Sequence, residues 1–200
     1  MSQSVDLGLV GDGGGNATKI VLNVGCGYPL RQKLHSYFHT ADWREIRLDV
    51  DATVKPDIVC SMTDMRPVES GSIDAIWSSH NLEHLQRHEV PRALSEFMRV
   101  LKPGGMLLMT MPDLQRIAEL VAANQLEDRA YVSASGPITP LDMIFGHTAS
   151  LARGDTFMAH RTGFTAKTLE RLLGEGGFTK VRVVRGNAFD LWAQAHKPVE

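Results

Sequence analysis

Two glycines on either side of a cysteine directly follow the first strongly apolar run of the chain. The run covers residues 20–24, and the loop after it reads Gly25-Cys26-Gly27. β-Branched residues that stop at glycines predict a buried parallel strand entering a tight turn. Because glycine has no Cβ, a ligand can approach the main chain closely beyond the carboxyl end of such a strand. The pattern indicates a candidate ligand-binding loop, although a tight turn without a ligand would explain a lone G-x-G equally well.

A carboxylate, Asp49, stands at the end of the next apolar segment, about 20 residues after the loop, where it can accept hydrogen bonds from both hydroxyls of a ribose. Asp49 is preferred to Asp51 because it lies directly at the expected strand end, and the alternative for Asp49 is a solvated turn. The glycine loop continues as Tyr28-Pro29-Leu30, so the third glycine of the dinucleotide fingerprint is missing. This disfavours a nicotinamide-dependent oxidoreductase. The sequence also contains no Gly-Lys-Ser or Gly-Lys-Thr, which excludes a P-loop.

Histidines are the candidate bases. His80, His84 and His88 recur every four residues and would share one face of a continuous helix, a spacing that can bind a metal. No cysteine or carboxylate obviously completes that set, and His80 is expected on the loop before the helix, so no metal site is predicted. His80 is the first candidate proton acceptor, while packing or capping is the expected role of His84.

A second focus is His160-Arg161, which could meet an anionic or hydroxylated ligand. His160 is the second catalytic candidate, and His147 is expected in the same pocket wall. The alternative is a surface loop that leads into a helix. Cys26 is interpreted as a structural residue of the glycine loop rather than as a nucleophile.

Strands alternating with helical stripes predict an α/β fold with a doubly wound, mostly parallel sheet. A single domain is expected over residues 19–200, after a flexible lead at 1–18 and with an insert or lid at about 124–163. Asp113 and Thr165 are predicted helix caps, and Lys102-Pro103-Gly104-Gly105 is predicted to end a helix and begin a strand. The strand candidates are residues 20–24, 46–48, 58–60, 75–78, 106–111, 181–184 and 191–195, and one helical stripe covers 90–101.

Composition restricts the class of protein. The chain has 200 residues, 43% of them hydrophobic, a formal charge of −2 and two cysteines. No apolar run approaches the roughly 20 residues that cross a bilayer, and no signal peptide is recognisable. We therefore expect a cytoplasmic protein that binds neither membranes nor nucleic acid. The sequence does not indicate an oligomeric state.

Five motifs occur in an order that resembles a known family. The ensemble is similar to class I S-adenosylmethionine-dependent methyltransferases of the small-molecule type over about residues 19–112. The motif around His160 is similar to one in small methyltransferases found beside sugar-processing genes. The resemblance implies a Rossmann-like sheet of seven strands with an antiparallel last strand. The motifs are Leu22-Asn23-Val24-Gly25-Cys26-Gly27, Asp49, Ile73-Asp74-Ala75-Ile76-Trp77-Ser78-Ser79-His80, Leu82-Glu83-His84-Leu85 and Arg99-Val100-Leu101-Lys102-Pro103-Gly104-Gly105.

The resemblance also implies a cofactor, S-adenosyl-L-methionine, and residues that contact it. The glycine loop would contact the methionine portion, Asp49 the ribose, the residues after the third strand the adenine, and those after the fourth strand the sulfonium and the acceptor. The implied contacts are Asn23, Gly25, Cys26, Gly27, Asp49, Ser61, Met62, Ser79, His80 and Asn81.

The predicted function is methyl transfer to an oxygen or nitrogen of a small acceptor, with sugars among the candidates. Because the sulfonium is already an activated donor, alignment of donor and acceptor can supply much of the catalysis, and a base is needed only where the nucleophile must lose a proton. The alternative is a protein of the same fold that binds the cofactor or acts as a scaffold without turnover.

Overall fold

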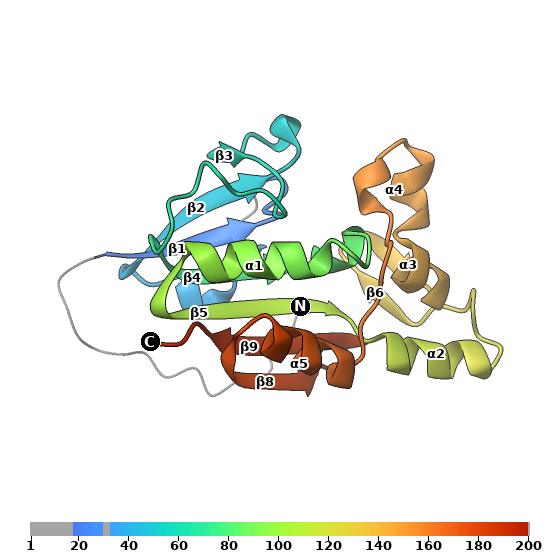
Figure 1. The fold of residues 1–200 in the computed structure, drawn as a ribbon. Coiled ribbons are helices and arrows are strands. Elements are labelled where there is room, and N and C mark those ends of the chain that lie inside the picture. Colours follow the sequence, from blue (N-terminus) through green and yellow to red (C-terminus); the bar gives the residue numbers. More distant parts are fainter. Residues whose placement is uncertain (1–17, 30–32, 200) are drawn as a thin grey trace.

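The computed structural model describes residues 18–29 and 33–199. Its main sheet has seven strands in the order β3-β2-β1-β4-β5-β9-β8 (Figure 1). Strands β1 to β5 pair in parallel, whereas β9 runs antiparallel between β5 and β8. The predicted fold class is confirmed; residues 1–17 of the expected lead lie outside the described residues. The strands are β1 (Lys19–Val24), β2 (Trp43–Asp49), β3 (Ile58–Val59), β4 (Ile73–Ser79), β5 (Leu101–Pro112), β8 (Thr179–Arg185) and β9 (Asp190–His196).

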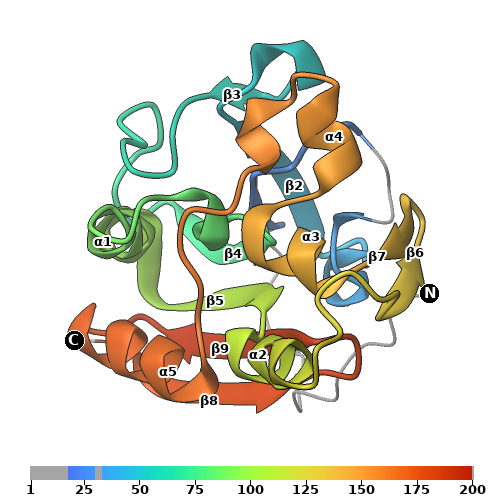
Figure 2. The same ribbon diagram turned by 90° about the vertical axis from the view of Figure 1, so that its right-hand side faces the viewer.

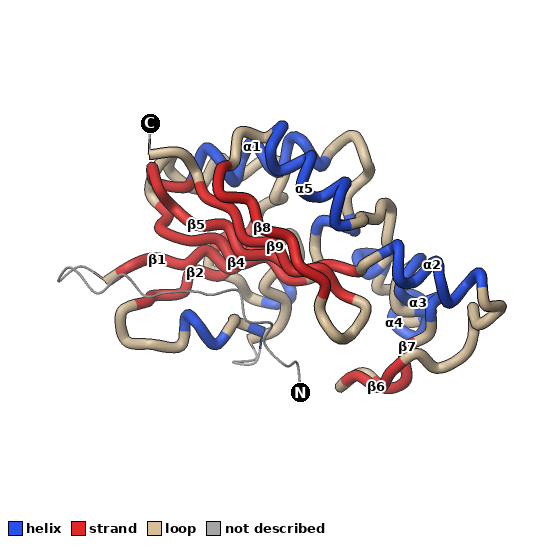
Figure 3. Tube along the Cα trace, turned by 90° about the horizontal axis from the view of Figure 1, so that it is seen from below, coloured by secondary structure: helices blue, strands red, loops and turns tan. Residues whose placement is uncertain are grey.

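Two amphipathic helices, α1 (Val90–Val100) and α5 (Ala166–Glu175), lie on one face of this sheet (Figure 3). Their apolar stripes are buried in a common core with the sheet, because the spacing of three and four residues keeps the stripe on one side of each helix. Thr165 forms the expected cap of α5: its hydroxyl accepts from Thr168 N, and the Thr168 side chain accepts from Thr165 N.

Aromatic side chains cover the opposite face. Phe38 from the 3₁₀ turn η2 (Ser36–Phe38) is buried in one cluster with Trp77 of β4 and Trp192 of β9. The two indole rings lie 5.9 Å apart. The described part of the connection from β1 to β2 contains no α-helix, so large aromatic rings cover this face, as α1 and α5 cover the other.

The segment between β5 and α5 lies at the carboxyl edge of the parallel strands (Figures 1 and 2). Asp113 caps α2 as predicted, with its carboxylate accepting from Gln115 N. Within the segment, Ile117 of α2 packs in a small core with Ile138 and Met143 of the expected insert at about 124–163. That this insert acts as a lid stays a prediction. Its elements are α2 (Leu114–Ala122), β6 (Tyr131–Ser133), β7 (Gly136–Ile138), α3 (Pro140–Phe145), α4 (Thr148–Ala152) and η5 (Thr156–Met158).

Among the helices that the structure describes, none combines the length and apolar character needed to cross a membrane.

Candidate functional site: a glycine loop and a buried carboxylate at the strand ends

The glycine loop turns sharply at the end of β1. Gly25 and Gly27 have φ angles of 66° and 57°, a left-handed conformation that glycine adopts without strain. The amides of Gly25 and Cys26 both donate to Leu48 O, at 2.9 and 3.1 Å, and Gly27 N donates to Asp49 Oδ2 at 2.8 Å. All three amides are thus bound to the end of β2. The three amides are therefore not free N–H donors, and the main chain of the two glycines is in contact with the side chains of Asn81 and Lys33.

Asp49 lies at the end of β2 beside this loop. Its Oδ2 accepts from Gly27 N, and its Oδ1 accepts from Asp51 N at 3.0 Å. A carboxylate has about four acceptor positions, so two remain for a pair of hydroxyls such as a ribose diol. Asp51 has another role, because its carboxylate caps the 3₁₀ turn η3 (Ala52–Val54) by accepting from Thr53 N at 2.8 Å. These contacts support the choice of Asp49 over Asp51.

Asn81 connects the glycine loop to β4. Its Nδ2 donates to Val24 O at 2.8 Å and to Ser79 O at 3.0 Å, and a Cβ at Gly25 would overlap its side-chain amide. The Lys33 ammonium occupies the corresponding position against Gly27. The structure thus brings Asn81 to the glycine loop, and its contact with the cofactor stays a prediction.

Cys26 is 2% exposed, and burial raises the pKa of its thiol to about 11. A thiol that stays protonated near neutral pH is a poor nucleophile, which agrees with a structural role.

The other predicted cofactor contacts are distributed over the neighbouring strand ends. Asn23 is buried in β1, where its Nδ2 donates to Glu45 Oε1 at 2.7 Å. Cys60 N donates to Asp49 O at 3.1 Å. Ser61 and Met62 directly follow Cys60, so they lie close to the end of β2. Ser61 Oγ accepts from Thr63 N within its own turn, and Met62 packs against the main core. A contact of these residues with a cofactor stays a prediction.

His80 directly follows β4 and has a φ of 54°, a conformation that a residue with a Cβ adopts at some cost. Its main-chain N donates to Thr110 O at 2.8 Å, and its Nδ1 lies 3.2 Å from Glu83 Oε1. The His80 side chain is 47% exposed. Desolvation opposes its charged imidazolium, but the hydrogen bond to Glu83 and the negative charges of Glu83 and Asp190 together outweigh this effect and raise the pKa of His80. The candidate proton acceptor is therefore held by a carboxylate that the sequence analysis did not assign to the site.

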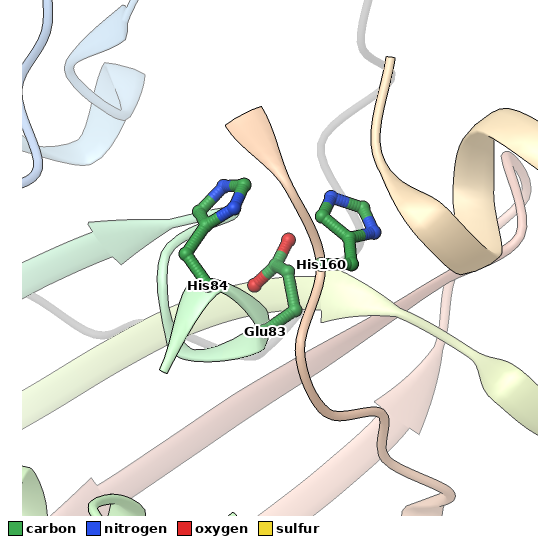
Figure 4. A group of neighbouring side chains, drawn as sticks. All are labelled: Glu83, His84 and His160. Atoms are coloured by element: carbon green, nitrogen blue, oxygen red, sulfur yellow. The ribbon is translucent and has the colours of Figure 1, made fainter. Parts of the chain in front are cut away.

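That carboxylate belongs to a cluster of Glu83, His84 and His160 (Figure 4). Glu83 and His84 lie on the 3₁₀ turn η4 (Leu82–His84), and His160 lies on the segment that returns from α4 to α5. Arg161 N donates to Glu83 O at 2.7 Å, which holds the two segments together. Because η4 ends at His84 and α1 begins only at Val90, the three histidines spaced by four do not share a continuous helical face, and His88 is exposed.

The carboxylate of Glu83 in this cluster is charged although it is almost completely buried. Glu83 is 1% exposed, and burial alone would raise its pKa, yet the hydrogen bond to His80 and the neighbouring imidazoles lower it, so the carboxylate is ionised. Burial lowers the pKa of His160, which favours the neutral ring. The sequence signal for Glu83 was its place beside His84 in a motif, but its burial and partners depend on a segment nearly 80 residues later.

A cavity of about 220 Å³ opens beside this cluster, between the end of β5 and α3. Glu83 and His160 line it together with Arg161, which supplies a positive charge. His147 does not belong to this lining, and its Nδ1 lies 2.9 Å from Ser150 Oγ. The lining residues are Glu83, Pro112, Leu114, Met143, Ile144, Phe145, His160, Arg161, Thr162 and Gly163.

A family model described as a methyltransferase domain matches residues 10–109, half of the chain. The chain belongs to this family. The match includes the glycine loop, Asp49 and η4, and the class I S-adenosylmethionine-dependent methyltransferase resemblance is confirmed. The association with sugar-processing genes is not shown.

Individual relatives agree with this methyltransferase assignment. A malonyl-[acyl-carrier protein] O-methyltransferase of Methylovorus sp. (strain MP688) is 30% identical over 112 residues, 56% of this chain. The match spans only about a third of that enzyme, 33% of its length.

Solved structures show the fold. A methyltransferase from Archaeoglobus fulgidus has a TM-score of 0.60 at 15% identity, covering 90% of this chain and 86% of its own. The Burkholderia thailandensis 1,6-didemethyltoxoflavin N1-methyltransferase, solved with its substrate and S-adenosylhomocysteine, has a TM-score of 0.56 at 16% identity, covering 91% and 72%.

Proposed function

We propose that this methyltransferase binds S-adenosylmethionine at the Gly25–Gly27 loop and transfers its methyl group to an oxygen or nitrogen of a small acceptor in the cavity beside Glu83. The observation that carries the proposal is the line of groups from Asp49 and the glycine loop, through Asn81 and His80, to Glu83 and the cavity. We expect one end of this line to hold the ribose and the methionine of the donor, and the other end is a partly open, largely apolar cavity that also carries Glu83, His160 and Arg161.

Different residues of the chain would bind the donor, align the acceptor and accept a proton during methyl transfer. Asp49 would hold the sugar of the donor, and the missing side chains at Gly25 and Gly27 let the donor lie close to the main chain. When bound, S-adenosylmethionine supplies an activated methyl group. The cavity would exclude water and align the acceptor, which is the main requirement of this transfer. His80 would take a proton from an acceptor that must lose one, while Glu83 orients its ring.

The class of acceptor follows from the lining of the cavity. Apolar side chains from α3 make up much of the wall, while Arg161 and the His160 imidazole can bind polar or anionic groups. A small hydroxylated molecule fits this mixture, and sugars belong to that class. The second candidate is a protein of the same fold that binds the donor or acts as a scaffold without turnover. The side chains of Asn81 and Lys33, which already lie against the glycine loop, favour the scaffold.

The test has two steps. Isothermal titration with S-adenosylmethionine, S-adenosylhomocysteine and NAD should give binding of the first two and none of NAD. Incubation with S-adenosylmethionine and a panel of sugars, hydroxy acids and amines, read by mass spectrometry for a methylated product, should then identify the acceptor. Binding of the donor with no product from any acceptor class would favour an inactive donor-binding protein, and absence of donor binding would overturn the first candidate and leave the scaffold.

His80→Ala tests the step after donor binding. We expect turnover to fall roughly 100-fold or more, the usual contribution of a positioned base, with the affinity for S-adenosylhomocysteine nearly unchanged. His88→Ala is the matched control, because His88 is exposed and outside the cluster. A variant at His80 that turns over at the normal rate would remove this residue from the reaction.

A further inference from the structure

We infer that Glu83, His84 and His160 form a binding site for one divalent transition-metal ion, with Zn²⁺ as its probe. Each residue offers one ligand atom, and these atoms all lie within 4.8 Å of one another. Two imidazole nitrogens and one carboxylate oxygen are a donor set that Zn²⁺ and related first-row ions prefer over Mg²⁺ and Ca²⁺. Figure 4 shows the carboxylate of Glu83 between the two imidazole rings.

Hydrogen bonds on the far side of each ring prepare the nitrogens for a metal. His84 Nδ1 lies 3.1 Å from Ala159 O, and His160 Nδ1 lies 2.9 Å from Met143 O. A carbonyl oxygen only accepts, so each Nδ1 carries the hydrogen and each Nε2 keeps its lone pair. Metal-binding histidines are oriented in this way, with the second nitrogen donating to a carbonyl or carboxylate. The rings themselves lie 4.9 Å apart between centroids.

The carboxylate of Glu83 supplies an independent observation. Its Oε1 lies against His80 Nδ1, whereas its Oε2 is buried and has no hydrogen-bond partner among the described residues. Leaving a buried charged oxygen unpaired is costly, and a cation at this point would remove the cost. The unpaired atom belongs to the same carboxylate that faces the two rings.

The main chain holds the three ligands in place before any ion binds. Arg161 N and Thr162 N both donate to Glu83 O, at 2.7 and 3.2 Å, and His160 N donates to Phe145 O at 3.1 Å. These bonds join η4, α3 and the returning segment around the cluster. Little rearrangement of the backbone is therefore needed to close the side chains on a metal, which favours affinity.

Three protein ligands leave a coordination position open, as in catalytic zinc sites. Glu83 and His160 also line the cavity, so an oxygen of a molecule in that cavity could complete the coordination. This consequence rests on the proposed function: the ion would hold the acceptor by a hydroxyl or carbonyl oxygen. The binding of the metal itself does not depend on methyl transfer.

The experiment measures metal binding directly, on the full chain without a histidine tag after treatment with EDTA and desalting. Isothermal titration with Zn²⁺ should give one ion per chain, and Mg²⁺ should not compete. His160→Ala and Glu83→Gln should each weaken Zn²⁺ binding at least tenfold, while His88→Ala and His147→Ala should leave it within twofold. Circular dichroism should show that each variant is folded.

A second measurement uses Co²⁺, whose visible absorption reports the ligands around it. A spectrum typical of nitrogen and oxygen ligands should appear with the unsubstituted protein and change or disappear in His84→Ala. Absence of a one-to-one Zn²⁺ complex, or equal affinity in His160→Ala and the unsubstituted protein, would overturn the inference and leave the histidines as a hydrogen-bonding cluster. If His160→Ala fails to fold, the Co²⁺ spectrum of Glu83→Gln decides in its place.

The same samples separate this inference from the proposed function. S-adenosylhomocysteine binding without Zn²⁺ binding would sink the metal site and keep the methyltransferase proposal. Zn²⁺ binding without binding of S-adenosylhomocysteine would keep the metal site and overturn the methyltransferase proposal. Full turnover in the EDTA-treated protein would keep the metal site but show that the ion does not hold the acceptor.

Discussion

A single carboxylate joins the two halves of the candidate site. Glu83 Oε1 lies 3.2 Å from His80 Nδ1, directly after β4, and the same carboxylate lies between the rings of His84 and His160. The sequence places Glu83 beside a histidine, but adjacent residues on a 3₁₀ turn need not share surroundings. Its 1% exposure comes from the segment around His160 that folds back over it. Spacing within one segment therefore could not show that His160 joins Glu83 and His84.

Asp49→Ala should weaken binding of S-adenosylhomocysteine by about 1–3 kcal/mol, the usual cost of losing a charged hydrogen-bond partner. Part of this loss would come from the loop, because Asp49 also accepts from Gly27 N. Isothermal titration measures the change. Asp51→Ala is the control, since Asp51 caps η3 and should leave the affinity nearly unchanged. Equal affinities for Asp49→Ala and the unsubstituted protein would show that the ribose binds elsewhere.

Gly25→Val should abolish cofactor binding, because a Cβ at this position overlaps the Asn81 amide and adds bulk to the loop. Left-handed backbone also disfavours valine, so a control must share that strain. Gly71→Val does so: its φ is 64°, and no described neighbour lies within 4 Å of a Cβ added there. Cofactor titration should separate the two variants. Similar binding by both would remove the loop from the site.

At the scale of elements, most strands and helices follow from periodicity, and their ends follow from local rules. Thr165 and Asp113 cap α5 and α2 as predicted. The predicted turn at residues 102–105 differs, because β5 already begins at Leu101, directly after α1. The register between β4 and β5 shifts between Ile73 and Ala75, because Ile73 pairs with Leu101 and Ala75 with Met106. The extra residues of the glycine turn thus form an irregularity within β5. The register pairs Leu101 and Met106 with β4 but gives residues 102–105, which lie between them in β5, no partner there.

The junction between α3 and the returning segment depends on Gly146. Its φ is 101°, and a Cβ there would overlap the main-chain carbonyl of Met158. Gly146→Val should lower the free energy of unfolding by about 1–3 kcal/mol and reduce turnover, because the segment that carries His160 is displaced. Urea unfolding and a turnover assay measure the two effects.

Gly154→Val is the matched control for Gly146→Val. Its φ of 91° carries similar backbone strain, but no described neighbour lies within 4 Å of an added Cβ. We expect a smaller loss of stability and normal turnover. If the two variants behave alike, contact between α3 and the returning segment does not position His160.

At the scale of the whole molecule, stability depends on the core between the sheet and its two helices. Phe97 of α1 is 0% exposed in this core. Phe97→Ala should lower the free energy of unfolding by about 3–5 kcal/mol, the range for buried aromatic residues. Phe157→Ala, at a position that is 55% exposed, should change it by less than about 1 kcal/mol. Urea unfolding followed by tryptophan fluorescence measures both, and equal losses would contradict the assignment of the core.

The amino-acid sequence by itself determined the family, the alternation of strands and helices, and the loop and carboxylate at the ends of β1 and β2. These features are local, since hydrophobic periodicity, glycines and caps act over a few residues. Only the tertiary structure decided that Glu83 is buried and that His160 lies beside His84, 76 residues away in number. Contacts between distant segments depend on how whole elements pack, and no spacing within one segment carries that information.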